Sequence, residues 1–270
     1  MPRFLQSLEA FVRAAALLAL VFILPPSTGL KAEGGSASEG EGVVSTYQLG
    51  DVLVTYFAPE GMRNLWGLNP DADDFFRAMN PRFKLVVLGA YGNPEEFLEF
   101  VRGLKAGEKA KLPKIAILST TRSMPEKSYA GERAKRQFTK YARWFGAATT
   151  TRIVAFGFEV KANSYLKSKL GVDLDFSYDL KKATGVFDRG PGSLSVGVLA
   201  KFLLNGGRGD NYLNTTALQI RDKLVFLSMI VPDHSDARVR DLNGELLRWR
   251  DRVAGANPAP DTGESSEKGV

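Results

Sequence analysis

The sequence has no cysteine among its 270 residues and a single histidine, His234. Without cysteine the chain forms no disulfide, and a lipid-anchored cleavage site, which needs a cysteine, is excluded. A zinc site would need His234 together with carboxylates, and a nucleophile paired with histidine has one candidate partner. His234 stands at the start of a predicted helix, so we expect it to be exposed or to cap that helix. Neither a P-loop nor a glycine-rich dinucleotide motif is present.

Paired acidic residues offer the remaining route to catalysis. Asp73 with Asp74, or Glu95 with Glu96, could supply the two carboxylates of a glycoside hydrolase. Each pair falls in the first turn of a predicted helix, where the helix dipole alone favours negative charge. Calcium could be bound by three aspartates on one face of a predicted strand, namely Asp173, Asp175 and Asp179. A straight strand spreads such side chains too far apart to surround one ion, so we predict no catalytic residue, metal ligand or cofactor.

Residues 1–32 predict an export signal. Arg3 and Arg13 provide positive charge, residues 14–24 form an uninterrupted apolar core, and a Pro-Pro pair ends it. The core is short for a bilayer span, so we expect cleavage and a periplasmic or secreted protein. An inner-membrane anchor through residues 1–24 is the alternative.

The rest of the chain divides by composition. Residues 33–42 are glycine, serine, alanine and glutamate, which predicts a flexible linker, and residues 258–270 predict a disordered tail. Residues 43–257 are long enough for a single domain with one core. The net charge of +6 is mildly basic, but basic and aromatic residues do not alternate on a strand face, so we do not expect nucleic-acid binding.

The clearest local pattern is a hairpin followed by a helix near the C-terminus. Strands over Thr215–Arg221 and Leu224–Val231 flank a polar turn at Asp222-Lys223. Both faces of the second strand are apolar, which predicts a central strand covered on both sides. The helix after it carries an apolar stripe at spacings of three and four, comprising Val239, Leu242, Leu246, Trp249 and Val253.

Shorter patterns extend the prediction to the whole domain. They indicate a hairpin (43–47 and 52–57), helices (71–79 and after Asn93-Pro94), strands (83–90, 114–119, 172–180 and 193–204) and a glycine-rich loop (205–211). We therefore predict an α+β fold. Its sheet is mainly antiparallel, with a C-terminal three-stranded meander, and amphipathic helices pack on it.

A basic stripe marks the predicted helix Tyr129–Phe145. One side carries alanines and aromatic residues, and the other carries Arg133, Arg136, Lys140 and Arg143. These four residues are the predicted partner-binding site, a docking face for anionic lipid or for an acidic partner. The alternative is an ordinary surface helix with a basic polar face. The arginines of the last helix form a second such surface.

The two ends of the domain resemble a known fold family. The hairpin that ends in Tyr56-Phe57-Ala58-Pro59-Glu60-Gly61, the hairpin around Arg221-Asp222-Lys223 and the closing helix with Trp249 are similar to Mog1/PsbP-type α/β sandwiches and to exported bacterial proteins of unknown function. Met62 departs from that pattern, because a tryptophan often follows this turn. Residues 80–170 are not covered. The resemblance implies an accessory or binding role and no catalytic residues.

These observations favour an exported envelope protein that acts as a non-enzymatic binding or accessory domain. Its partner would be an envelope protein or a small ligand, with contact to an anionic surface as a further option. A carboxylate-dependent hydrolase acting on envelope polymers is the alternative. An adhesive role for Arg208-Gly209-Asp210, in the predicted glycine-rich loop, is a third.

Overall fold

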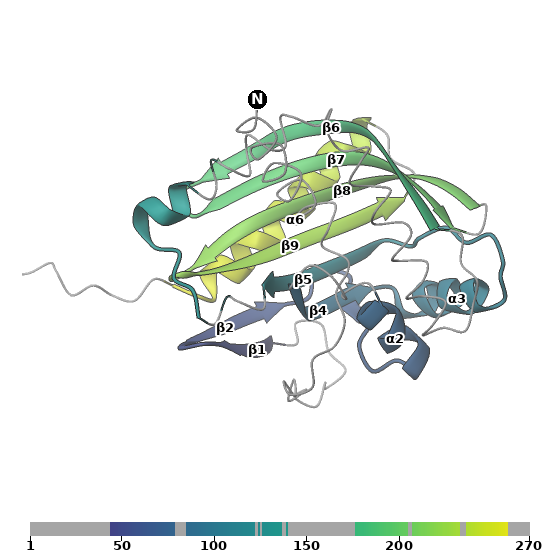
Figure 1. The fold of residues 1–270 in the computed structure, drawn as a ribbon, viewed down its shortest axis with the longest axis horizontal. Coiled ribbons are helices and arrows are strands. Elements are labelled where there is room, and N and C mark those ends of the chain that lie inside the picture. Colours follow the sequence, from purple (N-terminus) through teal and green to yellow (C-terminus); the bar gives the residue numbers. More distant parts are fainter. Residues whose placement is uncertain are drawn as a thin grey trace, which may run out of the picture.

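The computed structural model describes residues 44–78, 85–121, 124, 126–136, 139, 176–204, 207–232 and 236–258. Seven strands form one antiparallel sheet in the order β3-β4-β5-β9-β8-β7-β6, and β1 and β2 form a separate hairpin (Figure 1). The predicted export signal, the linker and residues 259–270 of the tail lie outside the described residues. None of the described helices is long and apolar enough to cross a membrane.

Strands and helices follow one another along the described chain. The strands are β1 (Val44–Leu49), β2 (Val52–Phe57), β3 (Arg63–Asn64), β4 (Leu85–Gly92), β5 (Ile115–Thr121), β6 (Phe176–Gly190), β7 (Ser193–Leu204), β8 (Gly207–Ile220) and β9 (Lys223–Pro232). The labelled helices are α2 (Pro70–Ala78), α3 (Pro94–Lys105) and α6 (Asp236–Gly255). Residues 131–136 are also helical. The predicted α+β class is confirmed.

β9 is the central strand of the seven, paired with β5 on one side and β8 on the other. Its residues from Lys223 to Val231 are all buried, which confirms the prediction of a strand covered on both faces. The turn before it lies one residue earlier than predicted, because Ile220 pairs with Lys223 across Arg221 and Asp222. Arg221 adopts a positive φ of 54°, which allows the two-residue turn.

The meander is longer than predicted. The predicted three strands correspond to β7, β8 and β9, and β6 adds a fourth through its pairing with β7. The prediction of a loop over residues 205–211 is wrong for residues 207–211, which belong to β8 and pair with Ala200–Leu204. Ladder hydrogen bonds to β7 override the turn preference of glycine there, and Arg208-Gly209-Asp210 lies in a strand.

The side chains of Asn69 and Asn93 cap helices α2 and α3. The side chain of Asn69 accepts a hydrogen bond from the Ala72 N–H at 2.8 Å, and that of Asn93 accepts from the first turn of α3. Gly107 follows α3 with a φ of 72°, as expected after a helix end. Aromatic rings join the two helices, with Phe76 stacked on Phe97 at a centroid distance of 4.8 Å.

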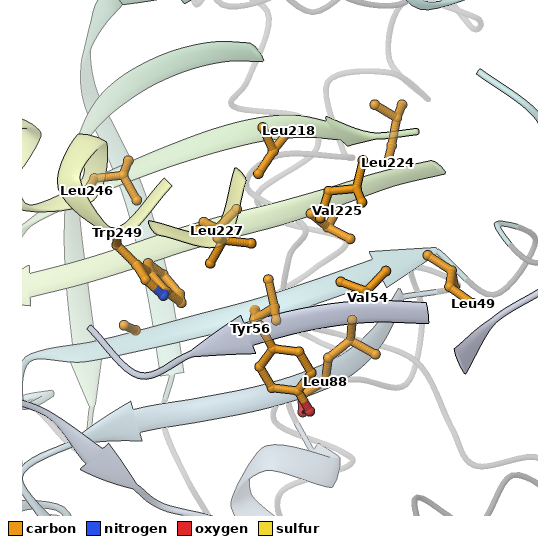
Figure 2. Close-up of a cluster of buried hydrophobic side chains, with 14 of the residues drawn as sticks. Leu49, Val54, Tyr56, Leu88, Leu218, Leu224, Val225, Leu227, Leu246 and Trp249 are labelled. Carbon is orange, nitrogen blue, oxygen red and sulfur yellow. Dashed lines mark hydrogen bonds between the residues drawn. The ribbon is translucent and has the colours of Figure 1, made fainter. Parts of the chain in front are cut away.

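α6 and the β1–β2 hairpin pack against the same face of the sheet and enclose a core with β4, β5, β8 and β9 (Figure 2). The predicted apolar stripe of α6 is confirmed at Leu242, Leu246, Trp249 and Val253, all buried. A side chain of α6 and the side chain two residues after the helix also fix β2. The Trp249 indole N–H donates to the Phe57 carbonyl at 2.7 Å, and the Asn257 amide pairs with both backbone groups of Thr55.

Candidate binding surface

Lys223 joins three segments that are far apart in the sequence. Its ammonium lies 3.1 Å from the Asp51 carboxylate in the β1–β2 turn and 3.3 Å from the Asp222 carboxylate in the β8–β9 turn. It also donates to the Lys127 carbonyl at 3.2 Å. Its side chain is only 5% exposed. Burial alone lowers the pKa of Lys223, but its hydrogen bonds and charge interactions with the two aspartates outweigh burial and leave the pKa raised.

The segment over residues 124–136 is fixed to the β8–β9 turn by further contacts. The Tyr129 N–H donates to the Asp222 carbonyl at 2.6 Å. The Leu224 N–H lies 3.2 Å from the sulfur of the buried Met124. Ala134 is buried too, so the helical turn that follows Tyr129 is held against the end of the sheet.

This helical turn presents two of the four predicted partner-binding residues. Arg133 and Arg136 are both exposed, and the Arg133 guanidinium lies over the Tyr129 ring, 5.2 Å from its centroid. Glu132 is neutralised by Lys135 at 2.8 Å, and this hydrogen bond lowers the pKa of Glu132. Lys140 and Arg143 lie outside the described residues, so the stripe of four stays a prediction.

The arginines of α6 form a different kind of surface. Arg250 does not lie on it, because its guanidinium is bound by Asp188 of β6 and by Asp251. Arg252 lies over the Phe57 ring at 5.1 Å. Three acidic residues interleave with the exposed arginines of this helix, Asp241, Glu245 and Asp251. The outer face of α6 therefore carries mixed charge, and we rank it below Arg133 and Arg136.

A polar layer lies between α6 and the strands β6 to β8, and the sequence patterns gave no sign of it. The buried Tyr212 hydroxyl donates to the Asn243 side-chain oxygen at 2.8 Å. The Asn214 amide donates to the Leu242 carbonyl at 3.0 Å and to Asn243 at 3.2 Å, while its own oxygen has no partner. Ser195 and Thr216 share a hydrogen bond of 2.7 Å nearby. The hydrogen bonds in this layer join neutral side chains of β7, β8 and α6.

Two of the carboxylates proposed for hydrolysis have structural partners. Asp73 accepts a hydrogen bond from the Gly67 N–H at 2.8 Å, and Glu96 accepts one from the Asn93 side-chain amide at 3.5 Å. One pair of carboxylates that the structure brings together shares a cation. Asp51 and Asp222 share Lys223, and the hydrogen bond from Lys223 lowers the pKa of Asp51. A lowered pKa makes a carboxyl group a poor general acid near neutral pH.

The remaining predicted site residues give no metal centre. Within the part of the chain that the structure describes, no group of three or more histidine, aspartate or glutamate side chains could hold a metal ion. Asp173, Asp175 and His234 lie outside that part, and Asp179 belongs to β6.

A scan against protein-family models found no match, and a search of the curated proteins found no significant match. The function is therefore inferred from the surfaces themselves.

Proposed function

We propose that the protein is a non-enzymatic binding domain of the cell envelope. In this proposal residues 1–32 direct export, residues 33–42 act as a linker, and the domain contacts an anionic envelope surface through Arg133 and Arg136. The observation that carries the proposal is the attachment of this basic turn to the end of the sheet by Lys223 and Tyr129. The resemblance to Mog1/PsbP-type sandwiches agrees with a binding role and stays a prediction.

The balance of charge at this end of the sheet supports the proposal. Glu132 is occupied by Lys135, and the Asp51 and Asp222 carboxylates are occupied by Lys223. Among the described residues, neither Arg133 nor Arg136 forms an ion pair, and the Glu132 carboxylate, which also attracts Arg136, is held by Lys135, so both guanidinium groups can bind an anionic group. Arginine suits that role because its planar guanidinium binds phosphate oxygens in pairs and keeps its charge at all physiological pH values.

The strength of the contact follows from its electrostatic origin. A basic side chain near an anionic lipid surface contributes about 1 kcal/mol, so two arginines give about 2 kcal/mol, roughly thirtyfold in binding. This attraction weakens as salt is added, because exposed charges are screened. The described pair alone gives weak binding, and a continuous stripe through Lys140 and Arg143 would strengthen it.

Co-sedimentation with lipid vesicles tests the proposal. The protein should bind vesicles rich in phosphatidylglycerol and not vesicles of phosphatidylcholine alone, and binding should fall as salt rises. The double substitution Arg133→Glu and Arg136→Glu should reduce binding by about thirtyfold or more. A matched control, Arg240→Glu with Arg248→Glu, makes the same charge change at two exposed positions of α6 and should lose much less. Equal losses in the two variants would reject this surface.

The hydrolase alternative gains no comparable support, because the two carboxylates that the structure brings together at Asp51 and Asp222 share Lys223. Assay of envelope polysaccharide hydrolysis after Asp51→Asn provides a direct check. We expect the Asp51→Asn variant and the unchanged protein to give the same result in this assay.

A further inference from the structure

Among the edge strands of the described part, β6 and β1 differ in chemistry; β3 has only two residues, and the free edge of β2 is bound by Asn257 and Trp249. β6 ends the seven-stranded sheet, and its pairing with β7 shifts register at three places. It also carries charged residues, among them Lys181, Lys182 and Arg189, and Gly185 has a φ of 88°. Bulges and charges are the features that stop an edge strand from pairing with another chain. β6 is therefore protected.

β1 has none of these features. Its sequence Val-Ser-Thr-Tyr-Gln-Leu is uncharged and lacks proline, and it pairs with β2 without a register shift. The residues are typical of strands, because branched and aromatic side chains fit a pleated surface. By its composition, β1 is an edge open to another strand.

The pairing of β2 shows which backbone groups of β1 point outward. Thr55 uses its N–H and C=O to bind Asn257, so these groups point away from β1. Thr46 lies directly opposite Thr55. In an antiparallel pair, the backbone N–H and C=O groups of two directly opposite residues point either toward each other or away from each other. The backbone groups of Thr46 therefore point away from β2. By alternation, the backbone groups of Val44 and Gln48 do the same.

The surface beside this edge is apolar as well. Val44 is 57% exposed and Leu53, which lies opposite Gln48, is 50% exposed. They are two of the three large apolar side chains that the described residues expose, and the third, Val186, lies on β6. Two of the three therefore belong to the hairpin. A strand added at β1 would cover Val44 and would bring side chains toward Leu53.

We propose that β1 pairs with β1 of a second copy of this chain, antiparallel, about a twofold axis at Thr46. The outward groups of Thr46 then bind Thr46 of the second copy, and those of Val44 bind Gln48. Two copies of the hairpin would form one four-stranded antiparallel sheet. A twofold arrangement uses the same surface on both copies, as most homodimers do.

The second copy is favoured over the chain's own ends for two reasons. Residues 33–42 and 259–270 are poor strands, because they are rich in glycine, serine and glutamate, and pairing of β1 with a segment of the same chain, such as residues 150–160, would give a monomer and overturn the proposal. β1 is in contrast complementary to itself. In this register no charged side chain faces another, and the threonines meet across the axis as a favourable cross-strand pair. Six residues bury less than a standard interface does, so the dimer should be weak and concentration-dependent.

Proline at position 46 tests the pairing selectively. The Thr46 N–H is not used in the β1–β2 ladder, so Thr46→Pro removes an outward donor while the hairpin keeps its own hydrogen bonds. Thr46→Val is the matched control, because it keeps the N–H and the strand preference. Sedimentation velocity over a concentration series should show self-association for the purified protein and for Thr46→Val, and a monomer for Thr46→Pro. A protein that stays monomeric at all concentrations would overturn the proposal.

The absence of cysteine permits a second test that does not depend on how well the proline variant folds. Thr46→Cys would place two thiols across the twofold axis, where paired strands bring Cα atoms to about 5.5 Å, within disulfide range. Thr184→Cys, at an exposed position on β6, is the control. Under mild oxidation Thr46→Cys should form a covalent dimer much faster than Thr184→Cys. Equal rates would mean random collision and would overturn the proposal.

Discussion

The two sides of α6 contact the sheet in different ways. Toward β2, β4, β5 and β9 the contact is mainly apolar, with Trp249 edge-on to Tyr91 at 6.0 Å and Leu246 fully buried, and one hydrogen bond joins the Trp249 indole to the Phe57 carbonyl. Toward β6, β7 and β8 the packing of Leu242 is accompanied by a polar layer, in which Tyr212, Asn214 and Asn243 are linked by hydrogen bonds. The apolar side lowers the free energy of the fold by removing surface from water. The polar side adds little net stability but fixes where the helix can lie, because each buried group must keep its partner.

The largest expected effect comes from the apolar side. Leu246→Ala should lower the free energy of unfolding by about 2–5 kcal/mol, because it removes a fully buried side chain and leaves a cavity. Leu247, the next residue of α6, is only partly buried, so Leu247→Ala is the control and should cost clearly less. Chemical denaturation of both variants measures the difference. Similar costs would mean that burial against β5 and β9 is not what stabilises α6.

The polar side can be disturbed without removing any group. A Cβ at Gly197 would overlap the Tyr212 and Thr184 hydroxyls, so Gly197→Ala should cost about 1–3 kcal/mol. Tyr212→Phe removes one of these hydroxyls, so the double variant should be less destabilised than the sum of the two single variants. A double-mutant cycle measures this coupling. Strict additivity would show that the clash does not involve Tyr212.

The dependence of stability on pH separates the two sides further. Burial raises the pKa of Tyr91 strongly, and no hydrogen bond of its hydroxyl is recorded among the described residues. A raised pKa in the folded state means that stability is complete below the unfolded pKa of about 10 and is lost as pH rises above it. The loss from one such group is about 1.4 kcal/mol per pH unit. Tyr91→Phe should therefore remove part of the alkaline loss while changing stability little at neutral pH.

Denaturant midpoints at neutral and alkaline pH measure this effect. The pKa of Tyr212 is raised by burial too, but its hydroxyl has hydrogen-bond partners. Tyr212→Phe should therefore destabilise already at neutral pH, by about 1 kcal/mol. If the two variants behaved alike at neutral pH, the distinction between an apolar and a polar side would fail.

Elements set by local signals were predictable from the sequence. The helix caps at Asn69 and Asn93 and the apolar stripe of α6 depend on residues within a few positions of one another. β9 was predictable because both its faces are apolar. The extension of β8 over residues 207–211 was not, because it depends on pairing with β7 rather than on its own glycine-rich sequence.

The candidate site divides in the same way. The exposure of Arg133 and Arg136 was predictable from helical periodicity. Their attachment to the sheet was not, because Lys223 connects Asp51, Lys127 and Asp222, and no local pattern relates these positions. The polar layer was missed for a similar reason, since Asn214 and Asn243 are 29 residues apart.

Hydrogen–deuterium exchange with and without phosphatidylglycerol vesicles tests the proposed function most directly. Binding through the anchored basic turn should slow exchange of the backbone amides in residues 126–136 and leave the outer face of α6 unchanged. The effect should disappear in the Arg133→Glu, Arg136→Glu variant and at high salt. Protection confined to α6, with residues 126–136 unaffected, would contradict the account.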